Sequence, residues 1–315
     1  MKFTVLYGDL TAHGSKRMRE VMALLVDGII YSSWLFVIAL GLTLIYGVMK
    51  ILNMAHGSLY ALGAYMAATL VGYWLGHGHA PLASYAMLAL AAVIVGVVAG
   101  PLIERGLLRF MYGRNEIVLL LVTYALFLIL EDVVKLIWGV DAYYVSEPYG
   151  MLGNFDFAGL TYPVYDLVLI AVSIVAGAAL ACVLRYTHHG KLLSAVIHDR
   201  EISMAMGINV ARFYLVTFTL GTMLAAIGGA LTAPTVSVVP GMGVQVIVLA
   251  FAVVVVGGLG SLPGAALGAL IVGLVRSAAV HYLPQVELFS IYGVMALVLI
   301  FRPKGLFAAA EVRKI

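Results

Sequence analysis

Between Phe213 and Val275 the chain contains no Asp, Glu, Lys, Arg or His. A stretch of this length can cross a bilayer two or three times, because one spanning helix needs about 20 apolar residues. Its apolar residues run continuously and do not alternate, which favours helices over the strands of a membrane barrel. The whole chain is 63% hydrophobic and only 10% charged, with a mean hydropathy of +1.08. We therefore predict an all-α, polytopic integral membrane bundle.

The apolar stretches predict about eight or nine membrane segments in one domain that covers residues 21–305. The expected spans lie near residues 22–46, 54–74, 84–103, 117–137, 164–184, 213–233, 244–262, 264–281 and 287–301. The first 20 residues lack the compact pattern of a cleavable signal, so the first span is expected to remain as an uncleaved anchor.

Lys and Arg gather in short stretches beside these spans, which indicates the cytoplasmic side of a membrane protein. The basic stretches are 16–20, 104–114, 185–212 and 302–304, followed by Arg313 and Lys314. Segments 1–20 and 306–315 are therefore both expected in the cytoplasm, and the acidic loop 139–163 outside. With both termini inside, however, the first two spans give the wrong parity. Either the chain breaks or re-enters around 47–63, or the amino terminus is external.

The sequence ILNMAHGSLYALG at residues 51–63 places polar groups inside the first long apolar region. Irregular backbone at membrane depth is tolerated where protein or a water-filled cavity surrounds it. We predict that Asn53, His56, Gly57 and Ser58 line a translocation pathway. The alternative is a cluster of hydrogen bonds between helices.

The run GGLGSLPG at residues 257–264 is a second interruption, and it also precedes Leu-Gly-Ala. Interrupted segments in two halves of a chain are a pointer to a transporter's central site. We therefore predict a weak internal repeat, and add Gly258, Gly260 and Ser261 to the expected pathway. A tight turn between two helices is the alternative reading.

The expected spans carry almost no embedded acid or base, and this limits the chemistry that they can perform. Glu131, Asp132 and Lys135 precede Trp138, an arrangement typical of a helix end that reaches the outer interface. His56 then has no obvious carboxylate partner in the membrane. We expect it to line the pathway or form a hydrogen bond, not to relay protons or catalyse.

The longest basic loop predicts a short amphipathic helix from Leu192 to Met206, with Gly207 as its stop. Asp199, Arg200 and Glu201 are expected on its polar side. Such a helix can lie on a membrane surface or dock into a groove of a partner protein. The mixed charges favour the partner.

Several classes of function lack their signature in this chain. No GxxxxGK[ST] phosphate loop, HExxH or paired-Cys spacing occurs. We expect no catalytic residues, no metal or other cofactor, and no nucleic-acid partner. Cys182 is the single cysteine and fits a packing role.

Five segments together resemble the branched-chain amino acid ABC permeases, from about residue 24 to residue 307. The segments are IALGLTLIYGVMKILNMAHGSLYALGAY, IERGLLR, GKLLSAVIHDREISMAMGINVARFYLVTFTLGTMLAAIGGAL, VVVVGGLGSLPGAALGALIVGL and FRPKGLF. Urea and amide permeases are similar to this family, and sugar permeases are more distant. Where many members have Phe, Met54 follows Asn53 here.

The resemblance implies a non-enzymatic transport subunit in a bacterial inner membrane, carrying branched-chain or similar small amino acids by alternating access. Its implied partners are a second homologous permease, two cytoplasmic ATP-binding subunits and an external solute-binding protein. The loop 185–212 would then couple to the ATPase, with the coupling residues His198, Asp199, Arg200, Glu201, Ala205 and Gly207. Alternative solutes are urea, amides and small carboxylates. Alternative classes are a stand-alone channel or carrier and, less in keeping with these residues, an intramembrane enzyme.

Overall fold

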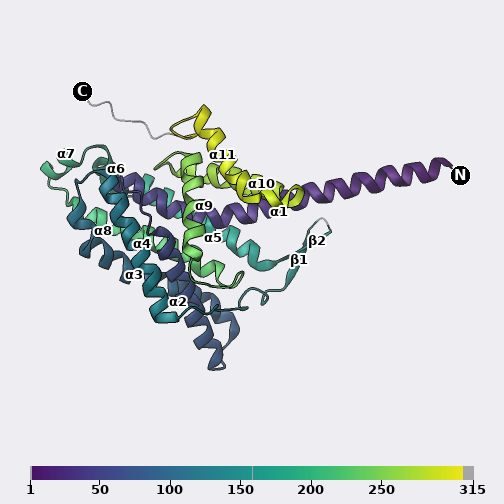
Figure 1. Ribbon diagram of the computed structural model, residues 1–315, viewed down its shortest axis with the longest axis horizontal. Helices are drawn as coiled ribbons and strands as arrows, with labels where there is room; N and C mark the ends of the chain where they lie inside the picture. The colour runs from purple at the N-terminus through teal and green to yellow at the C-terminus, as the bar shows by residue number, and fades with distance from the viewer. Residues whose placement is uncertain (1, 158, 308–315) are drawn as a thin grey trace.

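The computed structural model describes residues 2–157 and 159–307, and these are almost entirely helical (Figure 1). The helices are α1 (Lys2–Met49), α2 (His56–Gly76), α3 (Ser84–Gly106), α4 (Glu116–Trp138), α5 (Val164–Tyr186), α6 (His188–His198), α7 (Arg200–Ala205), α8 (Val210–Thr232), α9 (Met242–Gly257), α10 (Leu262–Tyr282) and α11 (Glu287–Phe301). The strands are β1 (Asn154–Phe157) and β2 (Leu160–Pro163). Of the predicted tail 306–315, residues 308–315 lie outside the described residues.

Eight helices in the described part are long and apolar enough to cross a membrane. They correspond to eight of the nine expected spans and confirm the predicted all-α membrane bundle. The exception is α9, whose 16 residues span only about 24 Å at the usual rise per residue. It is therefore shorter than the hydrocarbon core, and it starts inside the bundle after Gly241, whose φ of 85° only glycine adopts readily.

The centre of the bundle is the packing of α8 against α1, α2 and α3. Small residues let these backbones approach closely, as is typical of membrane helix pairs. A Cβ added at Gly63 would lie 2.4 Å from the Ala226 carbonyl oxygen, and one at Gly229 would lie 1.9 Å from that of Tyr60. The many glycines of α2 and α8 therefore fix how closely these helices cross.

The predicted interruption near residues 47–63 is a short connection between two complete helices. α1 ends at Met49, Lys50 takes a positive φ of 56°, and α2 starts at His56. The connection is enclosed by protein, since Ile51, Asn53 and Ala55 are each at most 1% exposed. The break is confirmed, but the chain does not re-enter there.

The two basic segments at 16–20 and 185–212 lie at opposite ends of the molecule (Figure 1). α1 runs antiparallel to α10, with Gly28 against Leu274 and Gly47 against Gly260. The amino-terminal part of α1 therefore points away from α6 and α7. At the opposite end of α1, the backbone N–H groups of Leu306 and Phe307 donate hydrogen bonds to the end of α9. The amino-terminal half of α1 and helices α6 and α7 therefore lie at opposite ends of the bundle.

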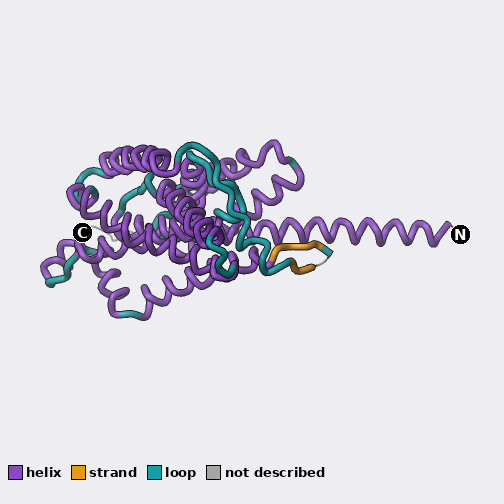
Figure 2. The backbone as a smooth tube through the Cα atoms, turned by 90° about the horizontal axis from the view of Figure 1, so that it is seen from below, coloured by secondary structure: helices purple, strands orange, loops and turns teal. Residues whose placement is uncertain are grey.

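The connection from α4 to α5 folds over the end of the molecule that carries the amino-terminal half of α1. Within it, β1 and β2 form an antiparallel hairpin, with Asn154 opposite Pro163. Figure 2 shows this hairpin alongside α1, and a Cβ at Gly159 would contact the Arg19 guanidinium at 3.4 Å. Tyr143 forms an isolated bridge with Val238, which ties the same connection to the segment before α9.

Candidate functional site

Three of the predicted pathway side chains, Asn53, His56 and Ser58, form a buried layer at the start of α2. Each is 0% exposed. His56 Nε2 lies 3.0 Å from the Ile38 carbonyl oxygen of α1, and Ser58 Oγ donates to the Phe127 carbonyl oxygen of α4 at 3.1 Å. The layer therefore joins three helices, as the interhelical hydrogen-bond alternative expects.

Glu131 belongs to the same layer and is enclosed by neighbouring helices, which the sequence did not predict. The residue is only 6% exposed. One carboxylate oxygen accepts from the Gly241 backbone N–H at 3.0 Å, and the other lies 3.5 Å from Ser58 Oγ. Burial of a carboxylate costs much less when donors satisfy its oxygens. Glu131 thus fixes the start of α9 against α2 and α4, and the interior of the bundle contains a carboxylate. We name Asn53, His56, Ser58 and Glu131 the polar layer.

Two members of the polar layer keep unsatisfied polar atoms. Both amide atoms of Asn53 and the Nδ1 atom of His56 have no hydrogen-bond partner among the described residues. Buried polar side chains in proteins are normally paired, because an unpaired group costs about 1–3 kcal/mol. Their presence here is not accounted for by packing alone.

The second predicted group, Gly258, Gly260 and Ser261, forms a tight turn far from this layer. Ser261 caps α10, since its hydroxyl accepts from the Gly264 N–H at 3.2 Å. Gly260 packs on Gly47, and a Cβ at Gly305 would lie 2.5 Å from the Gly258 Cα. The turn holds the ends of α1, α9 and the carboxyl-terminal segment together. The structure does not bring the two predicted groups into one site.

A large cavity of about 1040 Å³ lies next to the polar layer, on the side of the bundle that carries the amino-terminal half of α1. It is bounded by α1, α2, α5, α9, α10, α11 and the segment that leads from α8 into α9. None of the seven predicted pathway residues is among the described residues that line it. Its charged lining residues are Asp27, Asp166, Arg276 and Glu287.

One helical turn separates the cavity from the polar layer. Trp34 and Tyr60 both line the cavity, and their rings meet nearly edge-on with centroids 6.3 Å apart. Trp34 lies one turn before Ile38 on α1, whose carbonyl holds His56, and Tyr60 lies one turn after His56 on α2. The aromatic pair therefore stands between the charged cavity and His56.

One feature of the sequence indicates this cavity, although it was not among the predicted pathway residues. Asp27, Tyr31 and Trp34 occur at i, i+4 and i+7, a spacing that puts them on one face of a helix. A carboxylate and two aromatics on one stripe of an otherwise apolar span indicate a face that does not meet lipid. Together with Arg276 in α10 they correct the expectation that the spans carry almost no embedded acid or base.

The predicted amphipathic helix from Leu192 to Met206 is in fact two short helices, α6 and α7, and this corrects the prediction. The break is at Asp199, which has extended backbone angles and whose carboxylate accepts from the Ile202 N–H at 2.9 Å. Asp and Asn compete with helical hydrogen bonds and favour such caps. Gly207 ends the segment in the left-handed conformation, at φ 81°, as expected.

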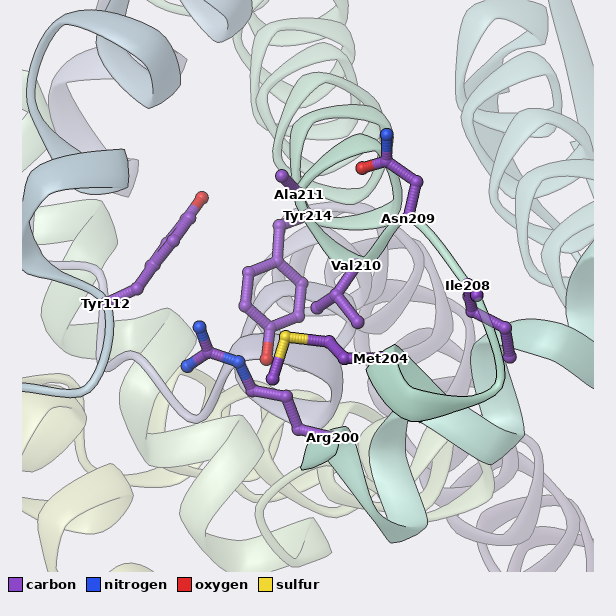
Figure 3. A pocket seen from close by; sticks show the side chains of 9 residues that line it. Tyr112, Arg200, Met204, Ile208, Asn209, Val210, Ala211 and Tyr214 are labelled. Atoms are coloured by element: carbon purple, nitrogen blue, oxygen red, sulfur yellow. The ribbon is translucent and has the colours of Figure 1, made fainter. Parts of the chain in front are cut away.

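Five of the six predicted coupling residues are exposed: His198, Asp199, Glu201, Ala205 and Gly207. The sixth, Arg200, is half-buried and points back into the bundle, in a cavity of about 440 Å³ between α7 and the start of α8 (Figure 3). Its guanidinium lies 6.0 Å from the ring centre of Tyr112 and 5.8 Å from that of Tyr214, distances that allow cation–π attraction.

The Tyr112 side of this cavity reaches the end of α3. Its hydroxyl donates to Glu104, a carboxylate on α3 that is only 2% exposed. Burial, with the hydrogen bond and charge of Glu104, raises the pKa of Tyr112, so its hydroxyl keeps its proton. Arg200 thereby connects α7 to α8 directly and to α3 through Tyr112. Sequence reasoning had placed Arg200 on the exposed polar side of the helix.

Comparison with known proteins decides the family. The family described as branched-chain amino acid transport system, permease component, matches residues 24–301. The chain belongs to this family. BraD, a high-affinity branched-chain amino acid transport permease of Pseudomonas aeruginosa, is 30% identical over 300 residues, with 92% of this chain and 97% of BraD covered.

Two further relatives are also transport permeases, for different solutes. LivH of Escherichia coli strain K12, a high-affinity branched-chain amino acid transport permease, is 27% identical, with 92% of this chain and 96% of LivH covered. The L-arabinose ABC transporter permease AraH of Azospirillum brasilense is also 27% identical, with 88% of this chain and 78% of AraH covered. The chain is thus a membrane-spanning amino acid transport permease by family.

Proposed function

We propose that this permease is the membrane subunit of an ATP-driven importer, which moves branched-chain or similar small amino acids across a bacterial inner membrane by alternating access. The observation that carries the proposal is the division of the molecule into two different ends. One end holds a large cavity lined by charged and aromatic side chains, and the other presents two short exposed helices. Family membership supplies the solute class and the expectation of an ATPase.

In this proposal the end with α6 and α7 faces the cytoplasm, and the cavity faces outside. The solute enters the cavity from an external binding protein and passes between Trp34 and Tyr60 towards Asn53 and His56. Their unsatisfied polar atoms become useful when the helices rearrange, because a solute can then hydrogen-bond to them. These contacts are few and neutral, which suits release more than tight binding.

Coupling is assigned to α7 and its flanks. Glu201, Ala205 and Gly207 are exposed and would contact an ATP-binding subunit, whereas Arg200 transmits the movement to α8 and, through Tyr112, to α3. The complete importer would contain a second homologous permease and two ATP-binding subunits. The turn at Gly258, Gly260 and Ser261 supports α10 on the same side.

The test is uptake and ATP hydrolysis by the permease expressed with its partner chains. Glu201→Arg and Gly207→Asp are expected to abolish amino-acid-stimulated ATP hydrolysis while the permease still inserts and assembles. Glu201→Arg reverses a surface charge at the contact, and Gly207→Asp forces a side chain into a left-handed backbone conformation. Arg105→Glu, an exposed charge reversal at the end of α3 and outside the loop 185–212, is the matched control. Normal coupled uptake in both variants would rule out the coupling assignment.

The alternative classes make different predictions in the same preparation. A channel or secondary carrier would transport without ATP-binding subunits, so gentle purification that recovers none of them, with intact uptake, would favour it. A solute panel of leucine, urea, small amides and short carboxylates identifies the solute class. Uptake of urea or a carboxylate in preference to leucine would reject the proposed substrate.

A further inference from the structure

The charged cavity has a composition that can be matched to the charges of a solute. Its charged lining residues in the described chain are one base, Arg276, and three acids, Asp27, Asp166 and Glu287. Its walls also carry aromatic and aliphatic side chains, among them Trp34 and Leu169. A volume of about 1040 Å³ is at the upper limit of small-molecule pockets. The cavity can therefore hold a small solute with some of its water.

We propose, building on the proposed function, that this cavity binds a zwitterion, with Arg276 taking the carboxylate and Asp166 and Asp27 taking the ammonium group. A corollary is that it rejects free carboxylates. Neither the family match nor the names of the relatives assigns these residues.

Asp166 is the residue that most needs a cationic partner. It is 9% exposed, it lines the cavity from the first turn of α5, and no side chain in the described part donates a hydrogen bond to it. A buried carboxylate without donors or counter-charge is costly in a protein interior. An ammonium group in the cavity would supply both the charge and the donors.

Asp27 acts on the same region of the cavity from α1. Its carboxylate lies 3.5 Å from His281 Nε2, and its side chain is 42% exposed. Burial first, and then the charges of Asp27 and Asp166 with a hydrogen bond to Asp27, raise the pKa of Tyr162 to about 12. Asp27 and Asp166 both line the cavity, from α1 and α5.

Arg276 is held in place for binding a second carboxylate. Its guanidinium stacks 3.8 Å from the ring centre of Tyr31 and forms an ion pair with Glu287 of α11. Its side chain is 29% exposed, so the group is not fully enclosed by these partners. A guanidinium has five donors in a fork that fits carboxylates, and Glu287 cannot use them all.

The balance of charge then distinguishes solutes. Three acids against one base give the cavity a net negative lining, which attracts an ammonium group and repels an anion. An amino acid satisfies both signs, whereas urea and amides leave the charged residues without a partner. Selection here would add to any selection by an external binding protein.

The test measures solute binding to the assembled transporter without an external binding protein, using radiolabelled leucine and two competitors. The competitors are 3-methylbutylamine, which is leucine without its carboxylate, and 4-methylpentanoate, which is leucine without its ammonium group. Wild type should bind leucine best, the amine more weakly and the carboxylate least.

The variants separate the two halves of the site. Asp166→Asn should weaken leucine and amine binding roughly tenfold, the scale of one charge-assisted hydrogen bond, and should improve 4-methylpentanoate. Arg276→Gln should weaken leucine by a similar factor and leave the amine unchanged. Asp132→Asn and Arg105→Gln, exposed positions away from the cavity, are the matched controls, and Asp166→Glu should restore much of the leucine binding.

Two outcomes would overturn the inference. One is wild-type leucine affinity in both Asp166→Asn and Arg276→Gln. The other is a ratio of amine affinity to carboxylate affinity that is the same in Asp166→Asn as in wild type. The proposed function is tested separately, by leucine uptake through the complete wild-type importer. If wild type takes up leucine and both variants bind leucine with wild-type affinity, the proposed function stands and the proposed binding site is rejected.

Discussion

The polar layer and the cavity lie one helical turn apart, yet they hold polar groups in opposite ways. In the polar layer Asn53, His56 and Ser58 are fully buried, and the carboxylate of Glu131 is satisfied by a backbone N–H. In the cavity the side chains of Asp27, Arg276 and Glu287 are partly exposed, and Asp166 is buried with no side-chain donor in the described part. The first arrangement fixes helices against one another, and the second leaves charge available to a solute.

The difference between the two regions follows from the residues that surround them. The polar layer is enclosed because glycines allow α2 to meet α9 and α8 almost backbone to backbone. The cavity lies one turn further along, where Tyr31, Trp34 and Tyr60 line it together with charged residues of α1, α5, α10 and α11. Backbone contacts therefore dominate in the polar layer, whereas side chains form the wall of the cavity.

The largest loss of folded protein is expected when a side chain is added at Gly57, where α2 packs against α9. A Cβ at Gly57 would lie 2.3 Å from the Gly243 carbonyl oxygen, so Gly57→Val must push α2 away from α9. We expect little or no folded permease, measured as the monodisperse fraction after mild detergent extraction. Gly72→Val on the same helix is the control, since a Cβ there meets nothing within 4 Å. Equal yields of the two variants would show that this contact does not hold the layer together.

Removing the carboxylate of the polar layer should have the next largest effect. Glu131→Leu leaves the Gly241 N–H without its acceptor and removes the partner beside Ser58. Hydrogen bonds to charged groups are worth about 1.5–3 kcal/mol, so the thermal midpoint of the purified permease should fall clearly. Glu131→Gln, which keeps an acceptor oxygen, should fall less. If the two variants melt together at the wild-type midpoint, Glu131 does not anchor α9.

Much of this architecture could be predicted from the sequence, because hydropathy reports on membrane helices directly. The break before His56 was also predictable, since an amide, an imidazole and a glycine interrupt an apolar run. The positions of Glu131 and Asp27 could not be predicted, because hydropathy averaged over a window hides one charged residue in a long apolar helix. Whether that charge faces lipid, protein or a cavity depends on which helices pack together. The break at Asp199 was missed because the apolar spacing continues through it.

Loss of the polar side chains themselves should reduce transport while assembly survives. His56→Ala removes the contact with the Ile38 carbonyl, and Asn53→Ala removes two polar atoms that have no partner among the described residues. We expect several-fold slower leucine uptake at normal membrane levels, because the proposed path loses its polar contacts. His77→Ala, at an exposed position between α2 and α3, is the control. Wild-type uptake in both variants would assign the polar layer to packing and not to the path.

The smallest effect is expected one residue from Glu131. Asp132 is exposed and pairs only with Lys135, at 3.1 Å on the same helix, with side-chain exposures of 73% and 45%. Exposed ion pairs contribute about 0–1 kcal/mol, so Asp132→Asn should leave the thermal midpoint and leucine uptake within error of wild type. Glu131 and Asp132 are neighbouring carboxylates, but we expect only the loss of Glu131 to destabilise the permease. The Glu131 side chain faces α9, whereas the Asp132 side chain points away from the bundle. A drop in midpoint as large as that of Glu131→Leu would contradict this, and would mean that α4 is rotated relative to its described position.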